Sequence, residues 1–359
     1  MSAAEAVLLV GGQGTRLRPL TSATAKPMLP TAGVPFLTHQ LVRLREAGVR
    51  RVVLATSYRA ETFSGHFGDG AHLGLDLDYA VEDEPLGTGG AIRNVADRLR
   101  SDADEPVVIL NGDILSDHDL AEQVALHREE GAEVTLHLVT VPDPRAFGCV
   151  PTDEQGRVTA FLEKLPDPVT DQINAGCYVF RRAAIDAIPP GRPVSVERET
   201  FPELVRAGQL VLGFVQTSYW LDVGTPAAYV RASCDLVRGI LPSAGLPGPA
   251  GDQLALPGAD VADGATVRGG TAVGSGAVVG PGAWVEGSVV MDGAVIEPGA
   301  RVVDSAVGVG AVVGRGTVLD GVVVGDGAHT GERNELGQGA RIWTAARLPD
   351  TSIRFSPDV

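Results

Sequence analysis

The sequence predicts an α/β domain with a mostly parallel sheet, followed by a parallel β-helix. Three observations carry this prediction. Apolar runs short enough for strands alternate with helix-like segments over residues 1–239, a pattern typical of a parallel sheet covered on both faces. Residues 240–258 are rich in proline and glycine and predict a linker. Beyond this linker, aliphatic residues recur every six positions.

The α/β elements follow one another in a regular order. Leucines at helical spacing predict a helix over residues 35–48, which Gly48 ends, and the buried strand at residues 51–55 completes a βαβ unit. The same reasoning gives the remaining elements. Strands are predicted at residues 75–81, 107–110, 134–139 and 158–162, and residues 173–180 are predicted as a loop that enters a strand. Helices are predicted at residues 92–99, 120–130, 196–208 and 226–238. Pro202 argues against an unbroken helix at residues 196–208.

The C-terminal repeat has two periods. Val261, Val267, Val273, Val279 and Val285 lie six residues apart, and from Val285 onward the aliphatic positions also repeat every 17 residues. Each turn is rich in glycine and alanine. A three-sided parallel β-helix needs this spacing, because each face contributes one inward aliphatic residue. We therefore predict a β-helix over residues 259–346 and a C-terminal tail over residues 347–359.

Composition narrows the class of protein. The 359 residues include 44% hydrophobic residues, enough for a large core, and the formal net charge of -16 disfavours a nucleic-acid binder. We find neither a signal-like segment nor an apolar run of about 18 residues, which predicts a cytoplasmic protein without a membrane span. The three cysteines, Cys149, Cys177 and Cys234, are far apart and predict buried thiols.

The first strand leads into a glycine-rich segment. The glycines of residues 11–14 let backbone N–H groups approach a polyphosphate, and Arg16 and Lys26 supply fixed positive charge. This is not a Walker loop, since no Gly-Lys-Ser/Thr follows, and Leu17 stands where a dinucleotide fingerprint requires glycine. An ordinary glycine-rich turn is the remaining alternative.

Seven segments together resemble the sugar-nucleotide pyrophosphorylases, in the order found in that family. They are G-G-Q-G-T-R-L-R-P-L-T at residues 11–21, K-P-M-L-P at 26–30, P-L-G-T-G-G at 85–90, N-G-D at 111–113, E-K at 163–164, N-A-G-C-Y-V-F at 174–180 and W-L-D-V-G-T-P at 220–226. With its hexapeptide repeats, the chain is most similar to the GDP-mannose-forming branch. The resemblance implies a Rossmann-like nucleotidyltransferase domain followed by a left-handed β-helix, and a homo-oligomer.

The resemblance also implies a reaction. GMP passes from GTP to mannose 1-phosphate when a sugar-phosphate oxygen attacks the α-phosphorus in line, giving GDP-mannose and pyrophosphate. This nucleophile is already anionic, so the reaction needs positioning and charge neutralisation rather than a general base. The lack of a Ser/His/Asp or Cys/His arrangement fits this chemistry. Glu82 or Glu84 could accept hydrogen bonds from guanine, or both could lie on a loop surface.

Residue roles are carried over from the family. Asp113 and Asp222 are expected to bind Mg²⁺ beside the α-phosphate, the alternative being two surface turns. Arg16 and Lys26 are expected to hold the departing pyrophosphate. The expected nucleotide-binding residues are Gly11, Gly12, Gly14, Thr15, Gly87 and Thr88. The expected sugar-phosphate-binding residues are Gly148, Glu163, Lys164 and Asn174.

Other readings stay open. Gly90 gives L-G-T-G-G where mannose enzymes often have L-G-T-A-G, so heptose or glucose 1-phosphate is an alternative acceptor. A non-catalytic, GDP-sugar-sensing homologue is possible, although such proteins often lack the charged residues retained here. An acyltransferase activity of the repeats would need a histidine base, and His329 is the only histidine in that region.

Overall fold

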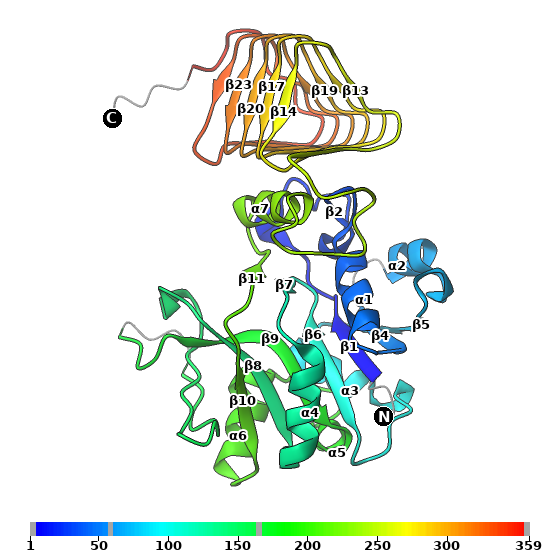
Figure 1. Cartoon of the computed structure of the whole chain (residues 1–359), viewed down its shortest axis with the longest axis vertical. Helices are drawn as coiled ribbons and strands as arrows, with labels where there is room; N and C mark the ends of the chain where they lie inside the picture. The colour runs from blue at the N-terminus through cyan, green and yellow to red at the C-terminus, as the bar shows by residue number, and fades with distance from the viewer. Residues whose placement is uncertain (1–4, 57–59, 163–166, 355–359) are drawn as a thin grey trace. The chain divides into compact units, whose positions relative to one another are not determined.

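A computed structural model describes residues 5–56, 60–162 and 167–354 of the chain (Figure 1). The chain forms two compact units. One comprises Met1–Gly12 and Gln40–Trp220, and the other comprises Gln13–His39 and Leu221–Val359. The second unit thus contains both the opening segment and the C-terminal repeats. The linear division at residues 239, 258 and 346 remains a sequence-based prediction.

The first unit is built on a seven-stranded sheet with the order β10-β8-β9-β6-β1-β4-β5. Its strands are β1 (Glu5–Leu9), β4 (Arg51–Thr56), β5 (Asp76–Val81), β6 (Pro106–Asn111), β8 (Val134–Thr140), β9 (Gln172–Arg181) and β10 (Val211–Val215). All neighbours run parallel except β9, which is antiparallel to both β6 and β8. The central strands β1 and β6 are aliphatic and buried, as strands covered on both faces must be. The predicted mostly parallel sheet is confirmed.

Helices cover this sheet. They are α1 (Phe36–Glu46), α2 (Ala60–Phe67), α3 (Gly87–Asn94), α4 (Leu120–Glu130), α5 (Arg182–Asp186) and α6 (Phe201–Arg206). α3 packs on β1 and β4, whereas α4 packs on β6, β8 and β9. The predicted bounds of α4 are confirmed, because the Asp119 side chain accepts a hydrogen bond from Glu122 N and Gly131 ends the helix with a positive φ.

Three local predictions were wrong. The helix expected to reach residue 99 ends at Asn94 and is followed by a short 3₁₀ turn, Ala96–Arg98. Residues 158–162 form only isolated bridges, and the beginning of residues 173–180, which was expected to be a loop, is already part of β9. By contrast, the break that Pro202 predicts within residues 196–208 is confirmed. This stretch divides into a π-helical turn, Val196–Thr200, and α6, in which Pro202 takes a first-turn position that needs no N–H donor.

In the second unit, the repeats form the three-sided parallel β-helix that their spacing predicts, consistent with the left-handed form that the family resemblance implies. Its three faces are β12-β15-β18-β21-β24-β26, β13-β16-β19-β22 and β14-β17-β20-β23-β25. Their bounds are β12 (Gln253–Ala255), β13 (Asp260–Val261), β14 (Thr266–Arg268), β15 (Thr271–Val273), β16 (Val278–Val279), β17 (Trp284–Glu286), β18 (Val289–Val290), β19 (Val295–Ile296), β20 (Arg301–Val303), β21 (Ala306–Val307), β22 (Val312–Val313), β23 (Val318–Asp320), β24 (Val323–Val324), β25 (Glu335–Leu336) and β26 (Arg341–Ile342). β12 lies within the stretch predicted as a linker.

The pairing register confirms both sequence periods. Val267 pairs with Val285, 18 residues on, and Val285 pairs with Val302, 17 residues on. The inward valines, isoleucines and alanines are almost fully buried and form the core of the coils. At one corner of the β-helix, side-chain hydroxyl groups accept hydrogen bonds from backbone N–H groups of the following coil. Thr271 Oγ1 accepts from Ser288 N, and Ser288 Oγ accepts from Ser305 N.

Within the second unit, helix α7 (Pro226–Val237) packs against both the β-helix and the opening segment. The opening segment forms a small hairpin of β2 (Pro30–Thr31) and β3 (Val34–Pro35). The Tyr229 hydroxyl donates to Pro30 O, and Ala32 N donates to Ser233 Oγ at 2.9 Å. Hydrogen bonds therefore hold the hairpin that follows the glycine-rich loop against the buried face of α7.

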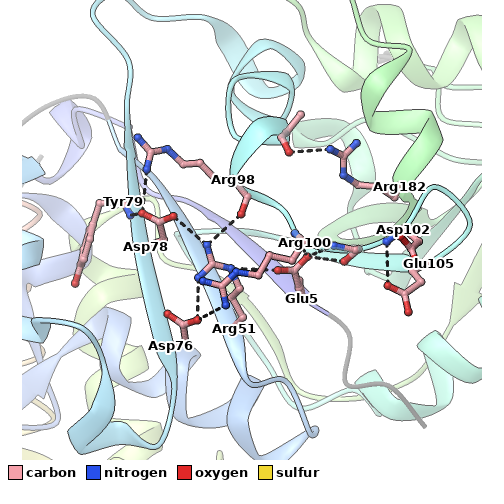
Figure 2. A network of polar contacts seen from close by, with 12 residues as sticks. Glu5, Arg51, Asp76, Asp78, Tyr79, Arg98, Arg100, Asp102, Glu105 and Arg182 are labelled. Atoms are coloured by element: carbon pink, nitrogen blue, oxygen red, sulfur yellow. Dashed lines mark hydrogen bonds and ion pairs between the residues drawn. The ribbon is translucent and has the colours of Figure 1, made fainter.

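A network of ion pairs and hydrogen bonds lies at the amino-terminal ends of β1, β4 and β5 (Figure 2). At its centre the Arg51 guanidinium lies 3.2 Å from Glu5, 2.9 Å from Asp76 and 3.0 Å from Asp78, and it also donates to Arg98 O. The Arg51 side chain is only 10% exposed. Removing one partner from a buried ion network is costly, because the remaining charges lose their compensation.

We expect Arg51→Met to lower the free energy of unfolding by about 3 kcal/mol, as broken buried pairs do. Arg100→Met is the matched control, since Arg100 also binds Asp76 but its side chain is 69% exposed. That variant should cost at most about 1 kcal/mol. Urea unfolding measures both, and equal losses would contradict the central role of Arg51.

Three buried histidines are His118, His127 in α4, and His137 in β8. His118 and His137 stack with ring centroids 3.7 Å apart, and the Arg43 guanidinium donates to His118 Nδ1. Desolvation, with Arg43 nearby, lowers the pKa of His137 to about 3, and burial lowers the pKa of His127 to about 4. Burial and the charge of His137 lower the pKa of His118 as well. These histidines are therefore neutral in the folded protein.

A histidine with a lowered folded pKa destabilises the fold in acid, because below pH 6.5 the unfolded chain binds a proton that the folded chain excludes. Between about pH 7 and about pH 5, His137→Phe should lose about 2 kcal/mol less free energy of unfolding than the parent protein. Neither ring nitrogen of His137 has a hydrogen-bond partner among the described residues, so phenylalanine removes no such bond. Parallel pH profiles for the two proteins would contradict the prediction.

Candidate active site

The opening loop follows β1 and carries Arg16. Residues 11–14 have no regular structure, and Thr15–Leu17 form a 3₁₀ turn. Gly14 has φ of 60° and its carbonyl accepts from Leu17 N and from Thr21 Oγ1, at 3.0 and 2.8 Å. Thr15 and Arg16 are exposed, so the loop presents backbone and a guanidinium rather than apolar side chains. The predicted glycine-rich loop is thus a fixed turn.

Lys26 lies beside this turn. It begins the 3₁₀ turn Lys26–Met28, and a Cβ built on Gly14 would stand 2.9 Å from Lys26 Cβ. A side chain at residue 14 would therefore push the lysine away. Ala25, at a position where the family that the sequence resembles usually has proline, has φ of -63°, within the range of a proline ring. The loop keeps a proline-like path without that residue.

Asp222 and Arg16 meet at Gly224. Asp222 ends β11 (Trp220–Asp222), and a Cβ built on Gly224 would stand 2.6 Å from Arg16 Nη2 and 3.0 Å from Asp222 Oδ1. The Arg16 guanidinium therefore rests against the backbone of Gly224 beside the carboxylate. The Thr225 hydroxyl then caps α7 by accepting from Ala228 N. Two residues 206 positions apart, one cationic and one anionic, therefore both lie beside this glycine.

Asp113 follows the central strand β6. Gly112 N donates to Leu9 O at 2.9 Å, which extends the β1–β6 pairing to the residue before Asp113. The Gln40 amide donates to Asn111 O and Ile114 O, both at 2.9 Å, and so fixes the turn on either side of Asp113. Asp113 is half-buried at the carboxyl end of its strand, where open α/β sheets bind ligands. Asp113 and Asp222 belong to different compact units, and their convergence on one ion remains a prediction.

The expected base-binding residues start helix α3. Gly87 has φ of 70° and Gly89 N donates to Val194 O at 2.8 Å. The Thr88 hydroxyl donates to Glu197 Oε2 and accepts from Val196 N, both at 3.0 Å. Glu197 is a residue that sequence reasoning missed. Glu197 lies 109 positions from Thr88 in the sequence, so no local sequence pattern could relate the two residues.

The two open candidates for guanine recognition differ in environment. Glu82 Oε2 accepts from Leu86 N at 3.3 Å, and burial raises the pKa of the Glu82 carboxyl despite that bond. Glu84 is exposed. Glu82 therefore supports the turn that leads into α3, whereas Glu84 belongs to a loop surface.

Among the expected sugar-site residues that the structure describes, Asn174 makes two hydrogen bonds through its side chain. It lies in β9, its amide nitrogen donates to the Tyr178 hydroxyl at 2.9 Å, and its oxygen accepts from Gly176 N. Gly148 precedes a bridge between Cys149 and Leu162. Nearby, Trp220 Nε1 donates to Ala175 O. Glu163 and Lys164 lie outside the described residues.

Comparison with known proteins decides the family, because the model for nucleotidyl transferases matches residues 5–239. The chain belongs to the nucleotidyl transferase family. Such enzymes typically use a divalent metal ion. In the ranges that the structure describes, no cluster of three or more metal-ligating side chains occurs, and no helix is long and apolar enough to cross a lipid bilayer.

Individual relatives extend this comparison. The nucleotidyl transferase is 56% identical over 356 residues to mannose-1-phosphate guanylyltransferase of Mycobacterium tuberculosis, covering 99% of this chain and 98% of the relative. It is 39% identical over 230 residues to the mannose-1-phosphate guanylyltransferase catalytic subunit beta of Drosophila melanogaster, covering 64% and 62% of the two chains. The crystal structure of HddC from Yersinia pseudotuberculosis complexed with GMP-PN matches with a TM-score of 0.54 and 28% identity, covering 64% and 98%.

Proposed function

We propose that this nucleotidyl transferase converts GTP and mannose 1-phosphate into GDP-mannose and pyrophosphate. The observation that carries the proposal is the 56% identity to a mannose-1-phosphate guanylyltransferase over 99% of the chain, repeats included. The similarity to a chain solved with GMP-PN supports guanine nucleotide as the donor. Arg16 and Asp222 both lie beside Gly224, where the guanidinium can neutralise phosphate charge and the carboxylate can hold a metal ion.

The chemistry is a displacement at phosphorus. An anionic oxygen of the sugar phosphate forms a bond to the α-phosphorus of GTP, and the bond from that phosphorus to the bridging oxygen breaks. Pyrophosphate departs with the electron pair. Arg16 and Lys26 offset the charge that grows on the leaving group, and the backbone of residues 11–15 orients the phosphates. Gly87 and Thr88 line the base side, and Gly148 and Asn174, with Glu163 and Lys164, bind the sugar phosphate.

The carboxylates fit a magnesium ion. Asp113 and Asp222 are half-buried oxygen donors at strand ends, and Mg²⁺ prefers a few carboxylates together with phosphate oxygens. We assign the ion to these two residues. When bound, it would draw electron density from the α-phosphate and neutralise the developing charge.

A panel of four nucleoside triphosphates against mannose, glucose and heptose 1-phosphates tests this proposal through pyrophosphate release. GTP with mannose 1-phosphate should give the highest kcat/KM. A higher value with heptose or glucose 1-phosphate would reassign the acceptor, which the Gly90 variation makes a specific alternative. No transfer with any pair would instead favour a GDP-sugar-sensing role.

We also propose that the enzyme is a cytoplasmic homo-oligomer that binds neither nucleic acid nor membranes. The long stacked coils of the β-helix offer surfaces for self-assembly, and the net charge of -16 opposes binding to polyanions. Light scattering should give a mass that is a multiple of the 37.2 kDa chain. A mass equal to one chain would contradict the assembly.

A further inference from the structure

Only some of the backbone carbonyl groups in the opening loop accept hydrogen bonds from within the loop. Within residues 14–19, four of the six carbonyl groups accept hydrogen bonds from donors inside residues 14–22. These are the carbonyls of Gly14, Thr15, Leu17 and Pro19. The carbonyls of Arg16 and Arg18 accept instead from one distant side chain, Arg341. A backbone acceptor without a protein partner must be satisfied by water, so the source of each bond decides how firmly the loop is held.

Arg341 reaches these carbonyls from the last strand of the β-helix. Its Nη1 atom lies 2.9 Å from Arg16 O and 2.7 Å from Arg18 O. β26 pairs in parallel with β24, placing Arg341 opposite Val323 and Ile342 opposite Val324. Because Ile342 is buried in the coil interior, strand alternation directs Arg341 outward. Arg341 therefore projects from a rigid coil, and both of its bonds are charge-assisted.

We infer that Arg341 is a positioning residue for the guanylyl transfer: it holds the backbone of the opening loop so that the Arg16 side chain stays in place for the departing pyrophosphate. This inference rests on the proposed function. Arg341 bonds to the backbone on both sides of Leu17, whose side chain is buried and anchors the turn. The β-helix thus has a catalytic purpose beyond assembly, since its final coil completes the support of the loop 325 residues earlier in the chain.

Two readouts on the full-length enzyme test this role. In Arg341→Ala, amide hydrogen exchange in peptides covering residues 14–22 should become several times faster, because the loop loses two carbonyl anchors. kcat should fall roughly ten- to a hundredfold, as displaced catalytic groups cause, while KM for mannose 1-phosphate stays unchanged. Arg341→Lys keeps the charge and a donor and should recover part of kcat. Arg347→Ala, an exposed arginine of the same coil, is the matched control and should change neither readout.

The outcomes separate the inference from the function on which it rests. Unchanged exchange in Arg341→Ala would overturn the loop contact, and faster exchange with unchanged kcat would overturn the positioning role. A fall in kcat for Arg347→Ala equal to that for Arg341→Ala would also overturn it. A parent enzyme without guanylyl transfer would refute the proposed function instead, and the exchange measurement would still decide whether Arg341 holds the loop.

Discussion

Asp222→Asn and Asp113→Asn are each expected to lower kcat by roughly a thousandfold while leaving the fold intact. Asparagine keeps the shape of the side chain but removes the negative charge that a magnesium ion requires. Losing one such ligand costs about 4 kcal/mol of transition-state stabilisation, and each 1.4 kcal/mol corresponds to about a tenfold change in rate. Pyrophosphate release measures the rate, and thermal unfolding checks the fold.

The control for this pair is Asp263→Asn, which makes the same chemical change at an exposed β-helix position. It should leave turnover unaltered. Chelation of divalent metal should abolish the activity of the parent enzyme, and added Mg²⁺ should restore it. Parent-level turnover in either Asp113→Asn or Asp222→Asn would remove that residue from the metal site.

Gly224→Ala is expected to reduce kcat about a hundredfold, the size of loss that a displaced catalytic group causes. The new Cβ would stand 2.6 Å from Arg16 Nη2, closer than real contacts allow. The atom that must move is the end of a flexible side chain, so stability should change little while Arg16 leaves its position. The substitution therefore separates an effect on the site from an effect on the fold.

A double-mutant cycle makes this prediction sharper. If alanine at residue 224 acts only by moving Arg16, then Gly224→Ala combined with Arg16→Met should be no slower than Arg16→Met alone. Gly65→Ala is the matched control, because its Cβ meets no atom within 4 Å in α2. It should leave kcat unchanged and stabilise the helix by up to about 1 kcal/mol. Additive losses in the cycle would contradict the link between Gly224 and Arg16.

Sequence reasoning succeeded where the determining forces are local or periodic. The β-helix register follows from aliphatic spacing alone, since Val285 and Val302 must occupy equivalent inward positions. The bounds of α4 follow from Asp119 and Gly131, which cap the helix through adjacent backbone groups. The glycine-rich loop could likewise be placed, because its glycines and flanking cations are contiguous.

The remaining features depend on contacts between distant segments. The antiparallel direction of β9 is set by the strands on either side of it, and its sequence carries no sign of direction. The bond from Thr88 to Glu197 spans 109 residues, and the bonds from Arg341 to the opening loop span more than 320. Exposed arginines and glutamates are common in any sequence, so only the fold shows which of them support a site.

The stereochemical course at the α-phosphorus tests the central claim most directly. We predict that GTP bearing sulfur at a single configuration of its α-phosphate reacts with mannose 1-phosphate to give product of inverted configuration, because one phosphate oxygen displaces pyrophosphate in a single in-line step. Retention would mean that the guanylyl group passes through a covalent intermediate on the protein, and would contradict the mechanism.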